Sequence, residues 1–285
     1  LYTAMADVAG ATGDEALMDA CRALWQSITQ RRMYITGGIG STANGEAFTT
    51  DYDLPNDTVY AETCASISLM FFARAMLENE HRGEYADVME QAFYNTVLAG
   101  MQLDGKRFFY VNPLEVIPGV SGVISTHRHV LPTRPQWYAC ACCPPNVART
   151  VSSLGAYAYS ENDDTFFIDL YAGGTVQTQK GLRLTCRTGF PYDGAVRYTV
   201  GGAGETTLAI RIPAWSVNTA LTVNGQTVEG TVSIRNRAPI PLSVLNQPVF
   251  DTEKTYDGNA DVTQPLLAGE AIGLLEGDVG KVFVT

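Results

Sequence analysis

The sequence predicts a mainly α-helical domain followed by an antiparallel β-sandwich, and two observations lead to this prediction. Up to about residue 160, apolar residues recur every three or four positions, as they do on one face of a helix. After about residue 163 the period becomes two, and short runs alternate as they do in half-buried strands. We therefore expect a helical domain over residues 1–160 and a sandwich over residues 161–285, with the strand pattern fading after about residue 236.

Four segments of the first half carry the helical spacing. Their apolar positions run from Leu17 to Ile28, from Leu69 to Leu77, from Val88 to Leu98 and from Val147 to Ala158. Pro144 and Pro145 precede the last segment, and proline is well suited to the first turn of a helix because that turn leaves its N–H groups unpaired. Long loops over residues 37–57 and 119–136 separate these helices, and such loops often carry functional residues.

Five segments of the second half are expected to form strands. They are Thr165–Tyr171, Leu182–Cys186, Ala195–Val200, Leu208–Ile212 and Leu221–Val228. The last contains Asn224-Gly225, the pair preferred in two-residue hairpin turns, so this segment predicts a hairpin.

Charge excludes several classes of partner. The 285 residues include 30 acidic and 19 basic side chains, which gives a net charge of −11. An acidic surface repels nucleic-acid backbones and anionic lipids, and no apolar run approaches the ~20 residues that span a bilayer. The chain opens Leu1-Tyr2-Thr3, without a signal peptide, so we expect a cytoplasmic location and a chain that begins inside a longer protein.

Cysteine and glutamate residues predict a metal site. Cys140, Cys142 and Cys143 are crowded before two prolines, and Glu62 and Cys64 lie two residues apart. An extended segment would point Glu62 and Cys64 the same way, and Pro144 would bias Cys143 away from helical angles and so turn neighbouring sulfurs toward one ion. Zinc takes thiolates and carboxylates tetrahedrally, although a plain buried cluster or a disulfide remains open at this point. Cys21 and Cys186 are interpreted as buried small hydrophobes.

Other residues could carry chemistry. Glu46 lies in a glycine-flanked loop and is interpreted by default as a solvated surface acid, although burial beside Ala47 and Phe48 would raise its pKa into the range of a general acid. The glycines of Thr36-Gly-Gly-Ile-Gly-Ser41 lack the lysine and the strand–turn–helix context of a phosphate loop. His127 and His129 either line a sugar site or are exposed loop residues, and Tyr110 is interpreted first as a core or wall residue.

Several motifs in one order resemble glycoside hydrolase family 127, the β-L-arabinofuranosidases. They are Thr36–Ser41, Gly45–Phe48, Tyr60–Ser66, Cys142–Asn146, and Arg211–Trp215 followed by Val223–Gly225. The resemblance implies that residues 1–160 are the C-terminal part of an (α/α)6 catalytic barrel, without its N-terminal part.

The resemblance also implies site roles and a reaction. Glu62, Cys64 and Cys143 would ligate Zn2+, and Cys142, on or close to the metal, would be the nucleophile. Glu46 would be the general acid/base, and Tyr110 would contact the reacting site. The implied activity is retaining hydrolysis that releases L-arabinose from β-L-arabinofuranosides, with an arabinose-containing oligosaccharide or glycopeptide as substrate.

Three other functions remain open. The scaffold could hydrolyse another furanosidic or acidic sugar, because one fold serves many substrates. The cluster could instead stabilise a non-catalytic carbohydrate-binding or scaffold protein through zinc, with no role for Glu46. A sugar epimerase would want histidine bases, and the chain has only 3 histidines.

Overall fold

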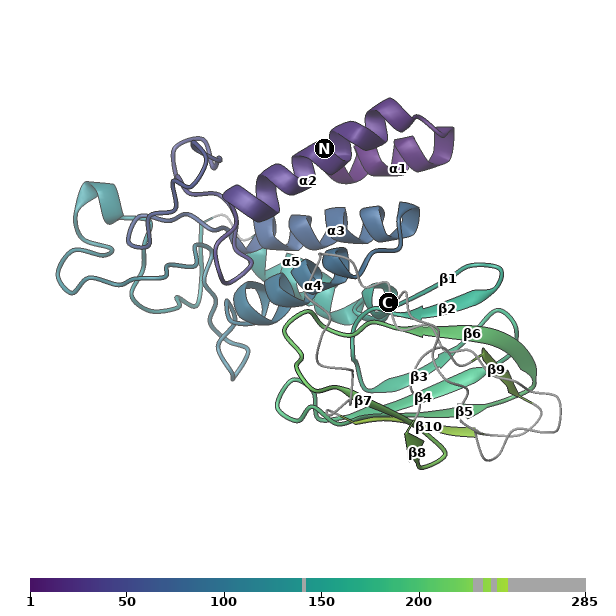
Figure 1. Ribbon diagram of the computed structural model, residues 1–285. Coiled ribbons are helices and arrows are strands. Elements are labelled where there is room, and N and C mark those ends of the chain that lie inside the picture. The colour runs from purple at the N-terminus through teal and green to yellow at the C-terminus, as the bar shows by residue number, and fades with distance from the viewer. Residues whose placement is uncertain (140–141, 228–232, 237–239, 246–285) are drawn as a thin grey trace. The chain divides into compact units, whose positions relative to one another are not determined.

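The computed structural model describes residues 1–139, 142–227, 233–236 and 240–245. The chain divides into two compact units, Leu1–Leu154 and Gly155–Thr285, and each unit is described by itself. The expectations for Cys140 and for most of the tail after residue 236 lie outside the described residues. A helical unit followed by a β-rich unit confirms the predicted order (Figure 1).

The first unit consists of helices joined by long loops. Its helices are α1 (Tyr2–Thr12), α2 (Glu15–Arg31), α3 (Thr63–Asn79), α4 (Gly83–Ala92) with the π-helical turn η1 (Phe93–Val97), the 3-10 turn η2 (Ser125–His127) and α5 (Cys143–Ser152). The sequence analysis did not predict α1, because its alanine-rich sequence has no sharply polar face to set a period. Among the described helices, none is long and apolar enough to cross a membrane.

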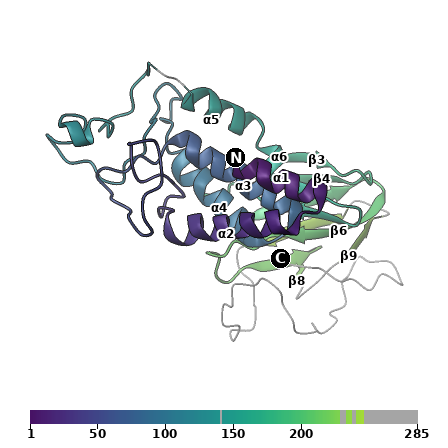
Figure 2. The ribbon, with the colours of Figure 1, turned by 90° about the horizontal axis from the view of Figure 1, so that it is seen from above.

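Helix α3 is the centre of this unit. Ten of its residues are buried, and they lie on nearly all sides of the helix, as expected where neighbours surround it. Helices α1, α4 and α5 pack against α3, and Figure 2 shows α5 along one side of it. The residues at the start of α3 are therefore held by a well-packed helix.

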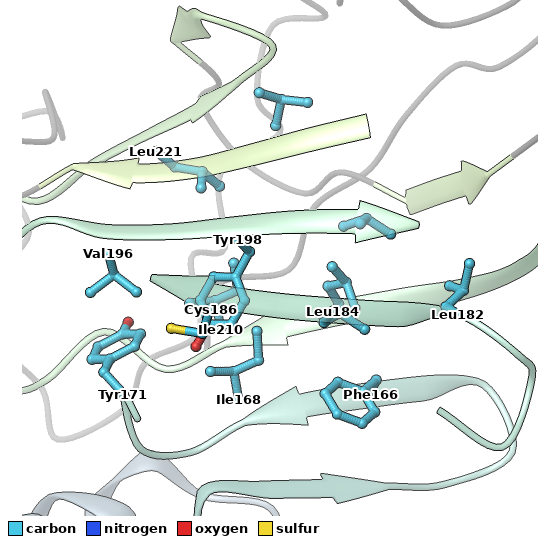
Figure 3. Packing of buried hydrophobic residues seen from close by; sticks show 13 residues of the cluster. Phe166, Ile168, Tyr171, Leu182, Leu184, Cys186, Val196, Tyr198, Ile210 and Leu221 are labelled. Carbon is cyan, nitrogen blue, oxygen red and sulfur yellow. The ribbon is translucent and has the colours of Figure 1, made fainter. Parts of the chain in front are cut away.

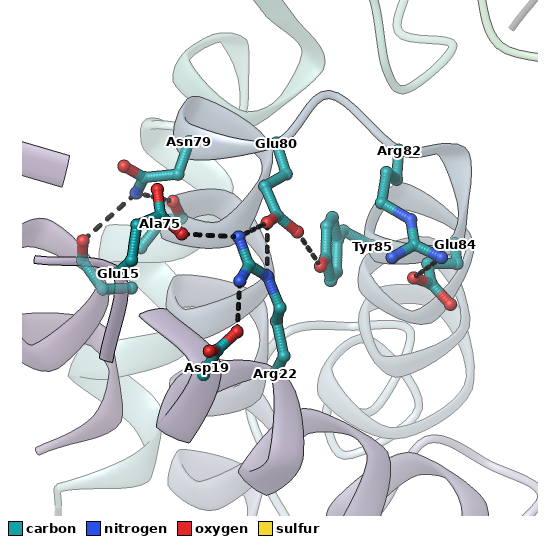
Figure 4. Close-up of polar contacts among 10 residues, drawn as sticks. Glu15, Asp19, Arg22, Ala75, Asn79, Glu80, Arg82, Glu84 and Tyr85 are labelled. Atoms are coloured by element: carbon teal, nitrogen blue, oxygen red, sulfur yellow. Dashed lines mark hydrogen bonds and ion pairs between the residues drawn. The ribbon is translucent and has the colours of Figure 1, made fainter. Parts of the chain in front are cut away.

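A polar network ties α2 to the end of α3. Figure 4 shows the Arg22 guanidinium between the carboxylates of Asp19 and Glu80. Tyr85 of α4 donates a hydrogen bond to Glu80 at 3.0 Å. Helices α2 and α4 thus meet the same carboxylate just after the C-terminus of α3.

The second unit begins with the short helix α6 (Gly155–Ala158). The strands that follow are β1 (Tyr159–Glu161), β2 (Thr165–Ile168), β3 (Gly174–Gln177), β4 (Arg183–Thr188), β5 (Val196–Gly201), β6 (Gly204–Ile210), β7 (Ala220–Val223), β8 (Gln226–Thr227), β9 (Ser233–Asn236) and β10 (Ile240–Leu245). In the described part of the chain they form one sheet in the order β1-β2-β6-β9 and another in the order β3-β4-β5-β10-β7-β8. All described pairs are antiparallel except β2 with β6, which is parallel, so the expectation of a wholly antiparallel sandwich is wrong there.

Both sheets contribute to one hydrophobic core. Figure 3 shows Phe166 and Ile168 of β2 in the same cluster as Leu184 of β4 and Tyr198 of β5. The alternation of buried and accessible residues along β4 and β5 is the period-two pattern of the sequence. Asn224 and Gly225 both have positive φ, 52° and 82°, so the predicted hairpin joins β7 to β8 as expected.

The predicted helix from Val147 to Ala158 is interrupted. Helix α5 ends at Ser152, and α6 begins at Gly155 in the second unit. The hydroxyls of Ser152 and Ser153 both bond to the Arg149 carbonyl, which competes with continued helical bonding at this end.

Candidate metal and active centre

Two helix N-termini bring the cysteines and Glu62 together. Glu62 is the N-cap of α3 and Cys64 lies in its first turn, while Cys142 is the N-cap of α5 and Cys143 its first residue. Because α3 and α5 pack side by side, the four side chains meet. The unpaired N–H groups at both helix starts favour negative charge at this place.

The four ligand atoms form a compact set. One carboxylate oxygen of Glu62 and the sulfurs of Cys64, Cys142 and Cys143 all lie within 4.8 Å of one another. The Cys142 sulfur is 3.6 Å from the sulfur of Cys64, 3.8 Å from that of Cys143 and 3.6 Å from Oε1 of Glu62. Three sulfurs and one oxygen at this spacing could hold a metal ion, and the donor set fits a tetrahedral site.

The backbone reasons for this convergence differ from those expected. Cys64 is helical, so no extended segment aligns it with Glu62. Cys143 is the first residue of α5 in spite of Pro144, so the proline does not keep Cys143 out of the helix. Proline at the second helical position is compatible with this because the first turn does not need its N–H.

The thiols share protons unequally. A hydrogen bond from the Cys143 thiol, together with one from Asn146, lowers the pKa of Cys64 to about 7. The same bond to Cys64, and then burial, raises the pKa of Cys143. Cys64 is thus the first of this pair to become a thiolate, and a cation at the centre would compensate the charge of several ionised ligands.

No described cysteine forms a disulfide. Cys64, Cys142 and Cys143 are free thiols, so a disulfide among them is excluded in this structure. Cys21 and Cys186 are free and buried, which confirms their interpretation as small hydrophobes.

Tyr110 reaches the cluster from a separate segment. Its hydroxyl lies 3.1 Å from the Cys142 sulfur, and its carbonyl accepts a hydrogen bond from the Thr63 N–H at 2.9 Å. Tyr138, which the sequence analysis did not single out, accepts a bond from the Tyr110 N–H at 2.9 Å and donates to the Phe108 carbonyl at 2.7 Å. Burial, followed by the contact with Cys142, raises the pKa of Tyr110, so its phenol keeps its proton and can donate to a sulfur anion.

Glu46 lies at a loop position with a positive φ of 50° and is exposed, which agrees with the default interpretation of a solvated acid and not with the alternative of burial beside Ala47 and Phe48. Tyr60 donates a hydrogen bond to Oε1 of Glu46 at 2.7 Å. The Tyr60 ring packs edge-on against that of Tyr110, with centroids 6.3 Å apart. Glu46 is therefore linked through two tyrosines to Cys142, and the sequence signal for Tyr60 was its place in the motif that contains Glu62 and Cys64.

The two loop histidines are partly buried and hydrogen-bonded. Nε2 of His127 lies 3.0 Å from the Asp57 carboxylate, and Nε2 of His129 lies 3.0 Å from the Thr58 carbonyl. The His129 ring lies 6.2 Å from that of Tyr60. These contacts fasten the loop of residues 119–136 to the segment that leads into Tyr60.

The glycine motif serves close packing. Gly37 has a φ of 76°, and a Cβ there would lie 2.5 Å from the Cα of Ala92. Thr96 of η1 donates a hydrogen bond to the Thr36 carbonyl at 2.6 Å. Backbone packing, and not phosphate binding, accounts for a glycine at position 37.

Comparisons with known proteins place the chain in a family. A family model described as β-L-arabinofuranosidase, GH127 catalytic domain, matches residues 2–156, and the GH127 middle domain matches residues 165–237. The non-reducing end β-L-arabinofuranosidase of Bifidobacterium longum subsp. longum is 45% identical over 241 residues, which are 81% of this chain and 36% of that protein.

Solved structures resemble the chain as well. A GH127 β-L-arabinofuranosidase from Geobacillus stearothermophilus T6 has a TM-score of 0.76 and 49% identity, covering 87% of this chain and 40% of that one. Another GH127 β-arabinofuranosidase has a TM-score of 0.74 and 33% identity, covering 85% of this chain and 41% of that one. The chain thus spans well under half the length of these relatives. With its catalytic and middle domains both matched, it belongs to glycoside hydrolase family 127.

Proposed function

We propose that this chain carries the zinc-binding and nucleophilic part of a retaining β-L-arabinofuranosidase. The observation that carries the proposal is the meeting of Glu62, Cys64, Cys142 and Cys143 within 4.8 Å at two helix N-termini. Three thiolates are soft ligands that suit zinc, whereas calcium and magnesium prefer oxygen. The helices of residues 1–154 would be part of an (α/α)6 barrel, as in the family the chain belongs to.

Cys142 is proposed as the nucleophile. It is exposed while Cys143 is fully buried, so a substrate could reach only the first of these two neighbours. Zinc, when bound, would keep the ligand sulfurs ionised at neutral pH and make sulfur a better leaving group. The Tyr110 hydroxyl, 3.1 Å from the Cys142 sulfur, would steady that sulfur as an anion.

The two steps follow from these positions. In the first step, a Cys142 lone pair forms the bond to the anomeric carbon, the glycosidic C–O bond breaks, and Glu46 gives its proton to the leaving oxygen. In the second step, Glu46 as a carboxylate takes a proton from water, the water oxygen displaces the sulfur, and L-arabinose leaves with its original anomeric configuration. This is the two-step retaining scheme with sulfur in place of the second carboxylate.

Substrates of the proposed enzyme are arabinose-containing oligosaccharides or glycopeptides. The curated relative is named for release from the non-reducing end of β-L-arabinofuranosides, and we extend that specificity to this chain.

Covalent labelling tests the proposal without requiring turnover. The zinc-loaded chain is incubated with a furanose-configured epoxide that has the β-L-arabino configuration, and the adduct is located by peptide mass spectrometry. We expect one adduct, on Cys142, and none in Cys142→Ser. Zinc retained without labelling would contradict the nucleophile and favour a non-catalytic zinc-stabilised module, while an adduct with another furanose configuration alone would favour another sugar.

A further inference from the structure

The residues that lead into α3 pair with a second short segment of the helical unit. Glu62 and Val111 form an antiparallel bridge. Next to this bridge, the Thr63 N–H donates a hydrogen bond to the Tyr110 carbonyl at 2.9 Å. The pairing therefore carries the candidate metal ligand Glu62 on one segment and Tyr110, whose hydroxyl contacts the cluster, on the other.

Asn112 holds the two segments together at one end of the pairing. Its side-chain nitrogen Nδ2 donates to the Ala61 carbonyl at 2.9 Å and to Oγ1 of Thr63 at 2.9 Å. Its backbone N–H donates to the same Ala61 carbonyl at 3.3 Å. The Thr63 hydroxyl gives its own proton to the Phe109 carbonyl at 2.9 Å, which leaves its oxygen as the acceptor for the amide. Asn112 is thus bonded to the residues on both sides of Glu62.

Ala61 has a backbone conformation that alanine rarely adopts. Its φ is 37°, a positive value at which a Cβ atom comes too close to the backbone. Such a conformation persists only where the surrounding contacts hold it. Here the Ala61 carbonyl accepts two hydrogen bonds from Asn112, and the Ala61 N–H donates to the Gly40 carbonyl at 2.8 Å. Because Ala61 directly precedes Glu62, its conformation sets the direction in which the Glu62 side chain leaves the backbone.

We infer that Asn112 is a positioning residue of the metal centre, which holds Ala61 at positive φ and so presents the Glu62 carboxylate to the ion. This inference rests on the proposed zinc site. Without the bonds from Asn112, Ala61 would relax to an ordinary conformation in the metal-free chain, and zinc binding would have to restore the strained one. Residues that orient ligands commonly change metal affinity by about 10- to 100-fold when they are replaced.

Zinc affinity measures this role directly. The metal-free chain and its variants are titrated with zinc against a chromophoric chelator, and the thermal midpoint of each metal-free form is recorded. We expect about a 10-fold or greater loss of zinc affinity in Asn112→Ala. Asn95→Ala is the matched control, because the exposed Asn95 amide donates to the Gln91 carbonyl, four residues earlier, at 3.1 Å.

A second substitution separates positioning from general destabilisation. Glycine adopts positive φ about as readily as negative φ, so Ala61→Gly removes the strain that Asn112 holds. Adding Ala61→Gly to Asn112→Ala should raise zinc affinity about 3-fold or more, and by more than Ala61→Gly raises it in the wild type. If Asn112→Ala does not fold, Asn112→Asp takes its place, because aspartate has the same shape and lacks the amide donors. The added negative charge would by itself attract zinc, so a loss of affinity in Asn112→Asp reports the missing donors.

The possible failures can be told apart. An affinity within about twofold of the wild type in Asn112→Ala, while Cys64→Ser loses zinc, would overturn the inference alone. A loss in Asn112→Ala that Ala61→Gly does not reduce would also overturn it, because Asn112 would then act through general destabilisation. No zinc binding by the wild type, or unchanged binding by Cys64→Ser, would overturn the proposed metal site and the inference with it.

Discussion

Replacing Gly37 with alanine should destabilise the helical unit strongly. Gly37 has a φ of 76°, which costs an alanine about 1–2 kcal/mol. The new Cβ would also lie 2.5 Å from the Cα and 2.6 Å from the backbone nitrogen of Ala92, and relieving such overpacking costs about 1–3 kcal/mol. The two contributions together predict a loss of about 2–5 kcal/mol in the free energy of unfolding.

Gly105→Ala is the matched control. Gly105 has a similar φ of 70°, but no atom lies within 4 Å of the added Cβ, so only the backbone cost of about 1–2 kcal/mol applies. Urea unfolding followed by circular dichroism at a helical wavelength measures both variants. Equal losses in the two variants would refute the argument that close contact with Ala92 requires glycine at position 37.

Three further predictions concern the site and its surroundings. In the active enzyme, Tyr60→Phe removes the 2.7 Å hydrogen bond to Glu46. We expect kcat to fall about 10-fold or more on an alkyl arabinofuranoside, whose poor leaving group needs a proton from Glu46, and to fall less on an aryl arabinofuranoside. Equal losses on both substrates would contradict a role of Tyr60 in positioning the proton donor. His127 holds the pKa of Asp57 below its ordinary value of 3.8, so the pair stabilises the chain above that pH and this stabilisation is lost as the pH falls through the lowered pKa. The thermal midpoint of the wild type should therefore exceed that of Asp57→Asn at pH 6 and approach it near pH 3, and a constant difference would count against the pair. Removing zinc with a chelator should lower the thermal midpoint by roughly 5–10 °C. A ligand present at 100 times its Kd contributes about 2.7 kcal/mol to the free energy of unfolding, and in a domain of this size that free energy corresponds to such a shift. An unchanged midpoint would argue against a metal that links α3 to α5.

The local spacing of apolar residues and turn residues was sufficient to predict the strongly periodic helices and the hairpin. The buried residues Met18, Cys21, Trp25 and Ile28 of α2 follow the helical period, and the Asn-Gly pair formed its hairpin. These features depend on neighbours within a few residues, so the sequence shows them directly. The alanine-rich α1 lacks such a period, and its burial depends on packing against α2 and α3.

Pairing over long distances could not be predicted in the same way. The parallel pairing of β2 with β6 joins Thr165–Ile168 to Thr207–Ile210, about 40 residues later in the chain. Alternation tells which face of each strand is buried, but it does not choose the neighbour or its direction. That choice depends on how two sheets share one core.

The candidate site shows the same division. Residue type indicated thiolate and carboxylate ligands among Glu62, Cys64 and the crowded Cys140, Cys142 and Cys143, because these groups suit zinc. The resemblance to the family then implied the set of Glu62, Cys64 and Cys143 with Cys142 on or close to the metal. The local reasons given for their convergence were wrong, since helix packing and not an extended segment brings them together. The sequence left both an exposed and a buried Glu46 open, and the structure shows that this side chain is exposed.

The sequence by itself determined the order of a helical and a β-rich unit, the main amphipathic elements, the family and the set of thiolate and carboxylate candidates. Only the tertiary structure decided that α3 and α5 present their N-termini to each other, that Tyr60 and Tyr138 support Glu46 and Tyr110, and that the Tyr110 hydroxyl lies against the Cys142 sulfur. The physical reason is the distance along the chain between the residues that interact. Periodicity and side-chain chemistry are properties of single residues and close neighbours, whereas the contact between the sulfurs of Cys64 and Cys142 exists only after two helices have packed.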